Sequence, residues 1–287
     1  MHGLMRLSWA RVLVLSLCAA VEKHDVPSAL SRFRSAAGAC VPAISHIPAT
    51  SERRHIVSPP EGPVALVCCA TTKGPLSIAV HPRWAPRGAQ RFMDMVRQGH
   101  FDEGVPMMRC LKEFLCQFGL SANPSRNGHS WPSLKDDPPW LPHGPKYRSD
   151  ASGGQRFKTG YMAYAGAGSN SRAQQLIVAN HDDCCLAGGS PWEVPFGELV
   201  GEDSFQTLAQ IYTGYGENGP SQGHLTNAGW TQADAEKFPL LDHITSCAVL
   251  EDATDVSDWE PYADGFMHPT FRGAASMPQY AIPGAPP

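Results

Sequence analysis

The chain has 287 residues, of which 42% are hydrophobic, so it is long enough to bury one or two cores. Charged residues make up only 17%, while 27 glycines and 26 prolines indicate many turns. The formal net charge is -4, and no basic run is longer than Arg53-Arg54, which argues against nucleic acid as a partner.

Residues 1–20 have the composition of a secretory signal peptide. Arg6 and Arg11 precede a short apolar stretch that ends in small residues and cannot span a membrane; a buried N-terminal helix is the alternative. Residues 21–61 are predicted to be a leader or disordered linker, and their Arg-rich part also suits an organelle transit peptide. We expect a secretory protein, in the ER lumen or secreted, or else one that reaches an organelle through a two-part leader. No membrane span is expected in the mature chain.

Nine cysteines are present, and removal of residues 1–20 would take one and leave eight. The remaining ones are Cys40, Cys68, Cys69, Cys110, Cys116, Cys184, Cys185 and Cys247. The spacing allows many pairings and does not choose among them. No Cys-x-x-Cys occurs and no matching His pair follows, so no zinc site is predicted. Most of the cysteines are expected to be small buried apolar residues.

A β-rich domain is predicted to begin near residue 62. The runs 64–70 and 76–81 flank a turn signal and predict a hairpin. A helix is predicted over 86–98, with Pro86 at its start and Gly99 at its end. Its apolar residues recur at helical spacing and should face a sheet. They are Ala89, Phe92, Met93 and Val96.

Residues 105–119 predict a second hairpin with a cation and an amide on one side. Each arm is about five residues long, which is short for a helix, and the chain turns at 111–113. If the strands pair symmetrically about that turn, Arg109 faces Gln117 and Cys110 faces Cys116. The two cysteines should then point away from the polar face, within disulfide range. Whether they form a disulfide remains open from the sequence.

Four segments together resemble one protein family. Through its order of Arg, Phe, Gln and Gly, 105–119 resembles the "Phe-His-Arg … Gly-Phe-Met-x-Gln-Gly-Gly" segment of cyclophilins, the peptidyl-prolyl cis-trans isomerases. Residues 159–179 align without a gap to the family's "Met-Ala-Asn-Ala-Gly-Pro-Asn-Thr-Asn-Gly-Ser-Gln-Phe-Phe-Ile". The stretch 74–92 looks like the family's opening of two strands, "Ala-Pro" and a helix, and 195–212 resembles its "Val-Phe-Gly-x-Val-x-x-Gly" and second helix. Residues 211–217 and 238–244 look like a subgroup with an elongated end before the closing strand, which is predicted near 246–250.

The resemblance implies a mostly β fold, a closed antiparallel eight-stranded cyclophilin-like barrel capped by two α-helices near 86–98 and 202–212. The domain would span 62–251. Residues 252–287 are rich in Gly, Pro, Ala and Ser and are predicted to be a disordered tail.

Residues 120–155 are polar and rich in turn formers, which predicts a long surface connection. Metal binding by Asp136 and Asp137 is the alternative to a plain solvated turn there. The Pro138-Pro139 sequence that follows favours the solvated turn.

Carried over position by position, the resemblance makes Arg109 the catalytic residue. The corresponding substrate-binding positions are Phe114, Leu115, Gln117, Ala165, Gly166, Ala167, Gln175, Ile177 and Leu186. Several positions depart from the family. The "Phe-His" before the Arg is Met107-Met108, the peptide-binding Asn is Gly166, the site Trp aligns near Cys185, and the site His has no clear counterpart.

The resemblance implies a peptidyl-prolyl cis-trans isomerase that acts on Xaa-Pro bonds in protein substrates, without cofactor or metal. Its partners would be Pro-containing polypeptides, and cyclosporin-like ligands with weakened affinity. The eroded site supports an alternative, a non-catalytic cyclophilin-like module that binds Pro-containing peptides or a partner protein. A thiol redox protein that uses Cys110 and Cys116 is less favoured, because a Cys-x-x-Cys helix start is lacking.

Overall fold

The computed structural model describes Cys40 and residues 65–82, 84–137, 157–182, 191–252, 259–261 and 267–269. The predicted signal peptide and, apart from Cys40, the rest of the predicted leader lie outside the described residues. The predicted site position Leu186 also lies outside them. Among the described residues, no helix has the length and apolar character needed to cross a bilayer.

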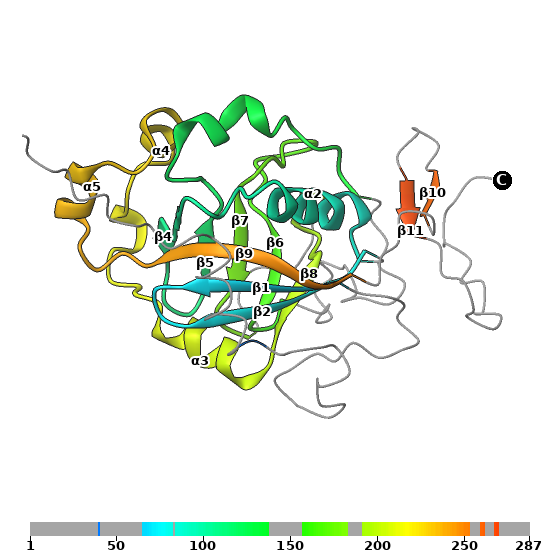
Figure 1. Ribbon diagram of the computed structural model, residues 1–287, viewed down its shortest axis with the longest axis horizontal. Helices are drawn as coiled ribbons and strands as arrows, with labels where there is room; N and C mark the ends of the chain where they lie inside the picture. Colours follow the sequence, from blue (N-terminus) through cyan, green and yellow to red (C-terminus); the bar gives the residue numbers. More distant parts are fainter. Residues whose placement is uncertain are drawn as a thin grey trace, which may run out of the picture.

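A nine-stranded sheet forms the body of the molecule, with the order β3-β9-β1-β2-β8-β6-β7-β5-β4 (Figure 1). In chain order the strands are β1 (Ala65–Thr71), β2 (Pro75–Val80), β3 (Val105–Pro106), β4 (Arg109–Cys110), β5 (Leu115–Phe118), β6 (Tyr161–Tyr164), β7 (Leu176–Ala179), β8 (Gly197–Val200) and β9 (His243–Asp252). Neighbouring strands pair antiparallel throughout this sheet. The predicted mostly β, antiparallel fold is therefore confirmed.

The observed sheet has nine strands, whereas a closed barrel of eight strands was predicted. The edge strands β3 and β4 are separated in the chain only by Met107 and Met108. Met107 N–H still donates to Asp242 O on the β9 side at 2.8 Å, whereas Arg109 pairs with β5. One run of chain thus changes its pairing partner and counts as two strands. The sheet curls until both edges meet in this run.

Two helices lie on opposite sides of the sheet, α2 (Pro86–Arg97) and α3 (Glu202–Gln210) (Figure 1). Both predicted helices are confirmed, and α2 buries the predicted apolar stripe. Two short helices were not predicted, α4 (Gln222–Ala228) and α5 (Gln232–Lys237). In each, only one residue is buried, so no apolar periodicity reveals them. Side-chain caps support them instead, including a capping box in α5.

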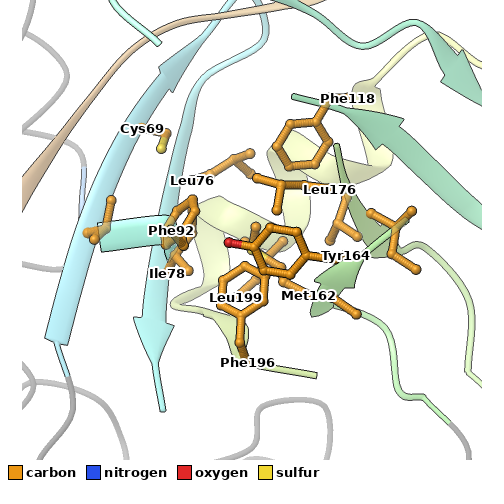
Figure 2. Packing of buried hydrophobic residues seen from close by; sticks show 14 of the residues in the cluster. Cys69, Leu76, Ile78, Phe92, Phe118, Met162, Tyr164, Leu176, Phe196 and Leu199 are labelled. Atoms are coloured by element: carbon orange, nitrogen blue, oxygen red, sulfur yellow. The ribbon is translucent and has the colours of Figure 1, made fainter. Parts of the chain in front are cut away.

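The core lies inside the curled sheet and beneath α2. Figure 2 shows Phe118, Leu176 and Tyr164 from β5, β7 and β6 in one buried cluster with Phe92 of α2 and with Phe196. Successive side chains on a strand point to opposite faces. The residues between these core positions on β5, β6 and β7 therefore point out of the barrel, where the predicted site lies.

Three disulfides join cysteines of the described residues: Cys40–Cys68, Cys69–Cys247 and Cys110–Cys116. These six cysteines are buried, as expected, but they are disulfide-bonded and not merely small apolar residues. Cys69 and Cys247 are cross-strand partners on β1 and β9, with Cα atoms 4.0 Å apart. Sequence spacing could not reveal this pair, because the fold brings together residues 178 positions apart.

The acidic pair at 136–137 also departs from expectation, because Asp137 is buried and not part of a solvated turn. Its carboxylate accepts hydrogen bonds from Arg87 N–H at 2.7 Å and Gly88 N–H at 3.1 Å, in the first turn of α2. Arg172, fully buried, donates to the same carboxylate at 2.8 Å. The positive end of the helix and the guanidinium together compensate the buried charge.

The predicted tail contains a second, two-stranded sheet. Strands β10 (Trp259–Pro261) and β11 (Met267–Pro269) pair antiparallel. These residues of the predicted disordered tail are therefore paired strands, and the rest of the tail after Asp252 lies outside the described residues. The closing strand β9 contains the predicted run 246–250 and extends beyond it at both ends.

Candidate active site

A row of outward-facing residues crosses three neighbouring strands. Arg109 of β4 pairs with Gln117 of β5, which pairs with Ile177 of β7. Leu115 and Gln175 share the same strand parity and the same outer face. The predicted register is confirmed, because Arg109 faces Gln117 and Cys110 faces Cys116. The disulfide Cys110–Cys116 lies on the inner face, away from this row, as predicted.

Hydrogen bonds connect the polar members of the row. Arg109 Nη1 donates to Gln117 Oε1 at 3.4 Å, and Gln117 Nε2 donates to Gln175 Oε1 at 2.8 Å. Gln117 is buried, whereas Arg109 is partly exposed, with 26% of its side chain accessible. The Arg109 guanidinium is therefore the solvent-accessible end of a hydrogen-bonded series, in which the amides of Gln117 and Gln175 orient each other.

The apolar candidates lie within this row, as Leu115 and Ile177 do, or next to it at the hairpin tip, as Phe114 does. Leu115 and Ile177 are buried, and Phe114 is partly buried against the core. Asn180 clamps the turn: its side chain accepts from Phe114 N–H at 2.6 Å and donates to Leu111 O at 2.8 Å. The three side chains form an apolar wall next to Gln117.

The loop at 165–175 carries the remaining described positions of the predicted site. Ala165 N–H donates to Gln175 O at 3.0 Å, and Ala167 is exposed. Trp192, in the short helix η5 (Pro191–Glu193), lies directly against Gly166. A Cβ placed on Gly166 would come within 2.8 Å of Trp192 Cβ. The sequence did not identify Trp192, because it aligns with no family site position.

Gly166→Asn tests this contact. The larger side chain cannot occupy the space that Trp192 fills, so the substitution should displace the indole instead of restoring an Asn-type peptide contact. In an NMR spectrum the Trp192 indole N–H signal should move, and in the background Trp192→Gly, which also removes the clashing Trp192 Cβ, the Asn should be accommodated without further loss of stability. An unchanged indole signal would show that the two residues do not compete for this space.

The packing of Met108 explains why the residues before Arg109 differ from the family's "Phe-His". Met108 stands where the family has His, and it is almost fully buried. It packs with Leu120, Leu225 of α4 and the partly buried Trp230. The elongated end of the domain thus contributes a small satellite core directly behind β4.

The same elongated end supplies a residue that the sequence did not identify. Glu217, in the short helix η6 (Gly216–Asn218), accepts from Arg109 Nε at 2.7 Å and from Arg109 Nη2 at 2.6 Å. These hydrogen bonds raise the pKa of Arg109 and lower the pKa of Glu217. A single acid in a Gly-rich segment, 108 positions from the Arg, gives no sequence signal for such a pair.

His100, which is fully buried and follows α2 in the chain, supports the end of β5. Its Nε2 lies 2.8 Å from Gly119 O, and its Nδ1 accepts from Trp131 Nε1 at 2.9 Å. An indole N–H only donates, so Nδ1 carries no proton and Nε2 must donate to Gly119 O. Burial lowers the pKa of His100 from 6.5 to about 4, with a smaller contribution from Arg126.

This lowered pKa predicts a stability that depends on pH. Above pH 6.5 His100 is neutral in both states, whereas between pH 6.5 and about 4 the unfolded chain takes up a proton that the folded chain excludes. The free energy of unfolding should therefore fall by about 3 kcal/mol as the pH falls through this window. Denaturant unfolding of the wild type and of His100→Gln at several pH values checks this, since the difference between the two profiles isolates His100. Identical slopes would contradict the assignment, and the exposed His129→Gln serves as control.

A cavity of about 570 Å³ lies apart from this row, between α3, the end of β7 and the hairpin tip. It is lined by residues such as Glu113, Asn180 and Phe205 and by none of the predicted site positions. Among the described residues, no group of three or more His, Cys, Asp or Glu side chains is arranged to hold a metal ion.

Comparison with known proteins identifies the family of this chain. The family model for the cyclophilin type peptidyl-prolyl cis-trans isomerase matches residues 66–229, more than half of the chain. The chain belongs to the cyclophilin-type peptidyl-prolyl cis-trans isomerase family. The match includes the whole row of predicted site residues, from Arg109 to Ile177.

Cyclophilin relatives are distant in sequence. The chain is 27% identical over 144 residues to a peptidyl-prolyl cis-trans isomerase-like 3 of Neurospora crassa, which covers 49% of this chain and 79% of the relative. It is 23% identical over 189 residues to a putative peptidyl-prolyl cis-trans isomerase of Staphylococcus epidermidis, covering 63% and 89%. Among solved structures, a cyclophilin type isomerase of Cryptosporidium parvum matches with a TM-score of 0.41 and 17% identity over 65% of this chain and 97% of that one.

Proposed function

We propose that this cyclophilin catalyses the cis-trans isomerisation of Xaa-Pro bonds in polypeptide substrates, with Arg109 as the catalytic residue. One observation carries the proposal: the Arg109 guanidinium stands on the outer wall of the barrel, linked to Gln117 and Gln175, beside the apolar wall of Leu115 and Ile177. The arrangement offers a cation, ordered amides and an apolar surface within one row of strands.

The reaction needs no nucleophile, because it rotates a C–N bond and neither makes nor breaks a covalent bond. The barrier of about 18 to 20 kcal/mol arises because the prolyl nitrogen donates its electron pair into the carbonyl group. At the perpendicular transition state this donation is lost, and the nitrogen gains a lone pair that accepts a hydrogen bond. A guanidinium N–H of Arg109 aimed at that nitrogen would stabilise the transition state more than the planar peptide, which is the condition for catalysis.

The apolar wall would add to this effect. Water stabilises the charge-separated planar amide, so moving the prolyl ring and its amide against Phe114, Leu115 and Ile177 weakens the resonance that opposes rotation. Gln117 and Gln175 would hold the flanking peptide while the bond turns. One charge-assisted hydrogen bond contributes about 1.5 to 3 kcal/mol, or roughly one to two decades of rate, so both contributions are needed.

A second candidate function is supported by specific features of the site. Glu217 already occupies one edge of the catalytic guanidinium, and Gly166 offers no side-chain amide to the substrate. A non-catalytic module that binds Pro-containing peptides would tolerate both features. Cyclosporin-like ligands should bind only weakly in either case, because Gly166 lacks the side chain that the family uses.

Refolding of a protein substrate distinguishes these functions. Isomerisation of non-native Xaa-Pro bonds produces a slow refolding phase of tens to hundreds of seconds. Catalytic amounts of the full chain should accelerate that phase in proportion to enzyme concentration and leave the fast phases unchanged. A substrate that refolds at an unchanged rate, although it binds the protein, would support the binding module.

We also propose that the mature protein resides in an oxidising compartment of the secretory pathway or of an organelle. The three disulfides of the described residues support this, because such bonds persist mainly outside the reducing cytosol. Mass spectrometry of the protein from its native cells should show a chain shortened near Ala20, or farther along the leader, with these disulfides intact. A full-length chain with free thiols would contradict this localisation.

A further inference from the structure

The segment that carries Glu217 follows the exposed edge of β4 closely. Gly216 lies next to the Leu111 side chain, Glu217 pairs with Arg109, and a Cβ at Gly219 would overlap the Met108 carbonyl oxygen. Only glycine permits the last approach. Residues 216–219 therefore run beside β4 and cover the strand edge that has no neighbour in the sheet order.

Packing behind the segment fixes its position. The Tyr215 ring lies against Tyr212 and Phe238, with ring centroids 4.9 and 5.2 Å away. The Tyr215 hydroxyl accepts from Leu240 N–H at 3.2 Å, and Asn218 N–H closes the turn on Tyr215 O at 2.8 Å. The backbone that presents Glu217 is thus anchored at both sides, although the Glu217 side chain is 62% exposed.

The contact with Glu217 leaves some N–H donors of Arg109 available to a substrate. A guanidinium has five N–H groups. Glu217 takes the one on Nε and one on Nη2, along one edge, and Gln117 takes one on Nη1. Within the described part of the chain, one N–H on Nη1 and one on Nη2 remain to meet a substrate.

We propose that Glu217 is a positioning residue for the isomerase reaction: it holds the Nε and Nη2 edge of Arg109 so that the remaining Nη1 and Nη2 hydrogens point at the prolyl amide. This inference rests on the proposed function and deepens it. A long Arg side chain on an open surface samples many rotamers, and a bidentate carboxylate restricts it to one. Orientation fixed before the reaction contributes to rate, not to substrate affinity.

The same contact has an opposite reading, in which Glu217 blocks Arg109 and lowers its activity. The edge that Glu217 occupies argues against it, because the contact leaves donors on both terminal nitrogens. The two interpretations predict opposite changes in kcat when Glu217 is removed. Removing a positioning residue slows turnover, whereas removing a blocking residue speeds it.

The experiment measures kcat and KM of the full chain on a Pro-containing peptide, in wild type, Glu217→Ala and Glu217→Gln. We expect Glu217→Ala to lower kcat roughly tenfold with little change in KM. Glu217→Gln, which retains one acceptor oxygen, should retain part of the rate. The control Glu236→Ala removes another exposed acid, which accepts a hydrogen bond from Gln232, and it should leave both constants unchanged. Melting temperatures should agree among all four proteins, since exposed ion pairs stabilise little.

The background Arg109→Ala decides whether Glu217 acts through Arg109. In that background Glu217→Ala should cause no further loss, because residues that act as a unit are not additive. An equal loss in both backgrounds, or an unchanged or raised kcat for Glu217→Ala, would overturn the inference while the proposed function stands. A wild type with no catalysed rate would overturn the proposed function and this inference with it.

Discussion

Arg109→Ala should lower kcat/KM for Xaa-Pro isomerisation by roughly ten- to a hundredfold, the share of one charge-assisted hydrogen bond. The fold should be unaffected, because Arg109 is partly exposed and its ion pair with Glu217 is open to solvent. Isomerisation kinetics and a thermal melt of the same preparation measure both effects. Arg109→Lys should recover little, since an ammonium lacks the planar fork that contacts Glu217, Gln117 and the prolyl amide at once.

Two further variants make this result specific. Arg126→Ala removes another partly exposed Arg that pairs with Glu103 at 2.7 Å, away from the row, and it should retain full activity. Phe114→Ala should weaken binding of the prolyl peptide and also lower the melting temperature, because Phe114 packs against the core. An Arg109→Ala protein with wild-type turnover would contradict the assignment of the catalytic residue.

Removal of the Cys69–Cys247 disulfide should have the largest effect on stability. The bond connects β1 to β9 across a sequence separation of 178 residues. In the chain-entropy model, a disulfide that closes a loop of that length raises the free energy of the unfolded state by about 5 kcal/mol, and this stabilisation is lost when the bond is removed. The double variant Cys69→Ala/Cys247→Ala should therefore lose most of the stability of an ordinary domain. Urea unfolding followed by circular dichroism measures the loss.

The hairpin disulfide provides a matched control. Cys110 and Cys116 are separated by 6 residues, so the same model assigns their bond about 2 kcal/mol. Both pairs join cross-strand partners in the barrel, and both leave small cavities when replaced by Ala. If the two double variants lose equal stability, loop closure does not explain the contribution of Cys69–Cys247.

Local sequence patterns predicted the parts of the fold that depend on neighbours in the chain. The alternation along 105–119 and its central turn determined the pairing of Arg109 with Gln117, because a hairpin fixes its own register. Pro86 and the spacing of Phe92 and Val96 determined α2 for the same reason. The family resemblance then supplied the closed antiparallel barrel, which local patterns do not contain.

The features that escaped prediction all depend on contacts between distant segments. Asp137 is buried because Arg172 and the start of α2 meet it, although the prolines after it are typical of an exposed turn. Glu217 reaches Arg109 only because residues 216–219 follow β4, and Trp192 covers Gly166 only because η5 folds over that loop. None of these contacts has a periodic signal. The structure therefore confirms the predicted register of the hairpin strands, whereas the contacts that loops make with these residues were not predicted.

Exchange NMR on a short peptide with one Xaa-Pro bond tests the central claim most directly, because one sample reports binding and turnover together. With catalytic amounts of the wild-type chain, the account predicts exchange between cis and trans signals far above the slow uncatalysed rate. Peptide-induced shifts should appear at the side-chain amides of Gln117 and Gln175, and Arg109→Ala should retain the shifts while most of the exchange is lost. Wild-type protein that shows those shifts without any catalysed exchange would contradict the account and identify the domain as a binding module.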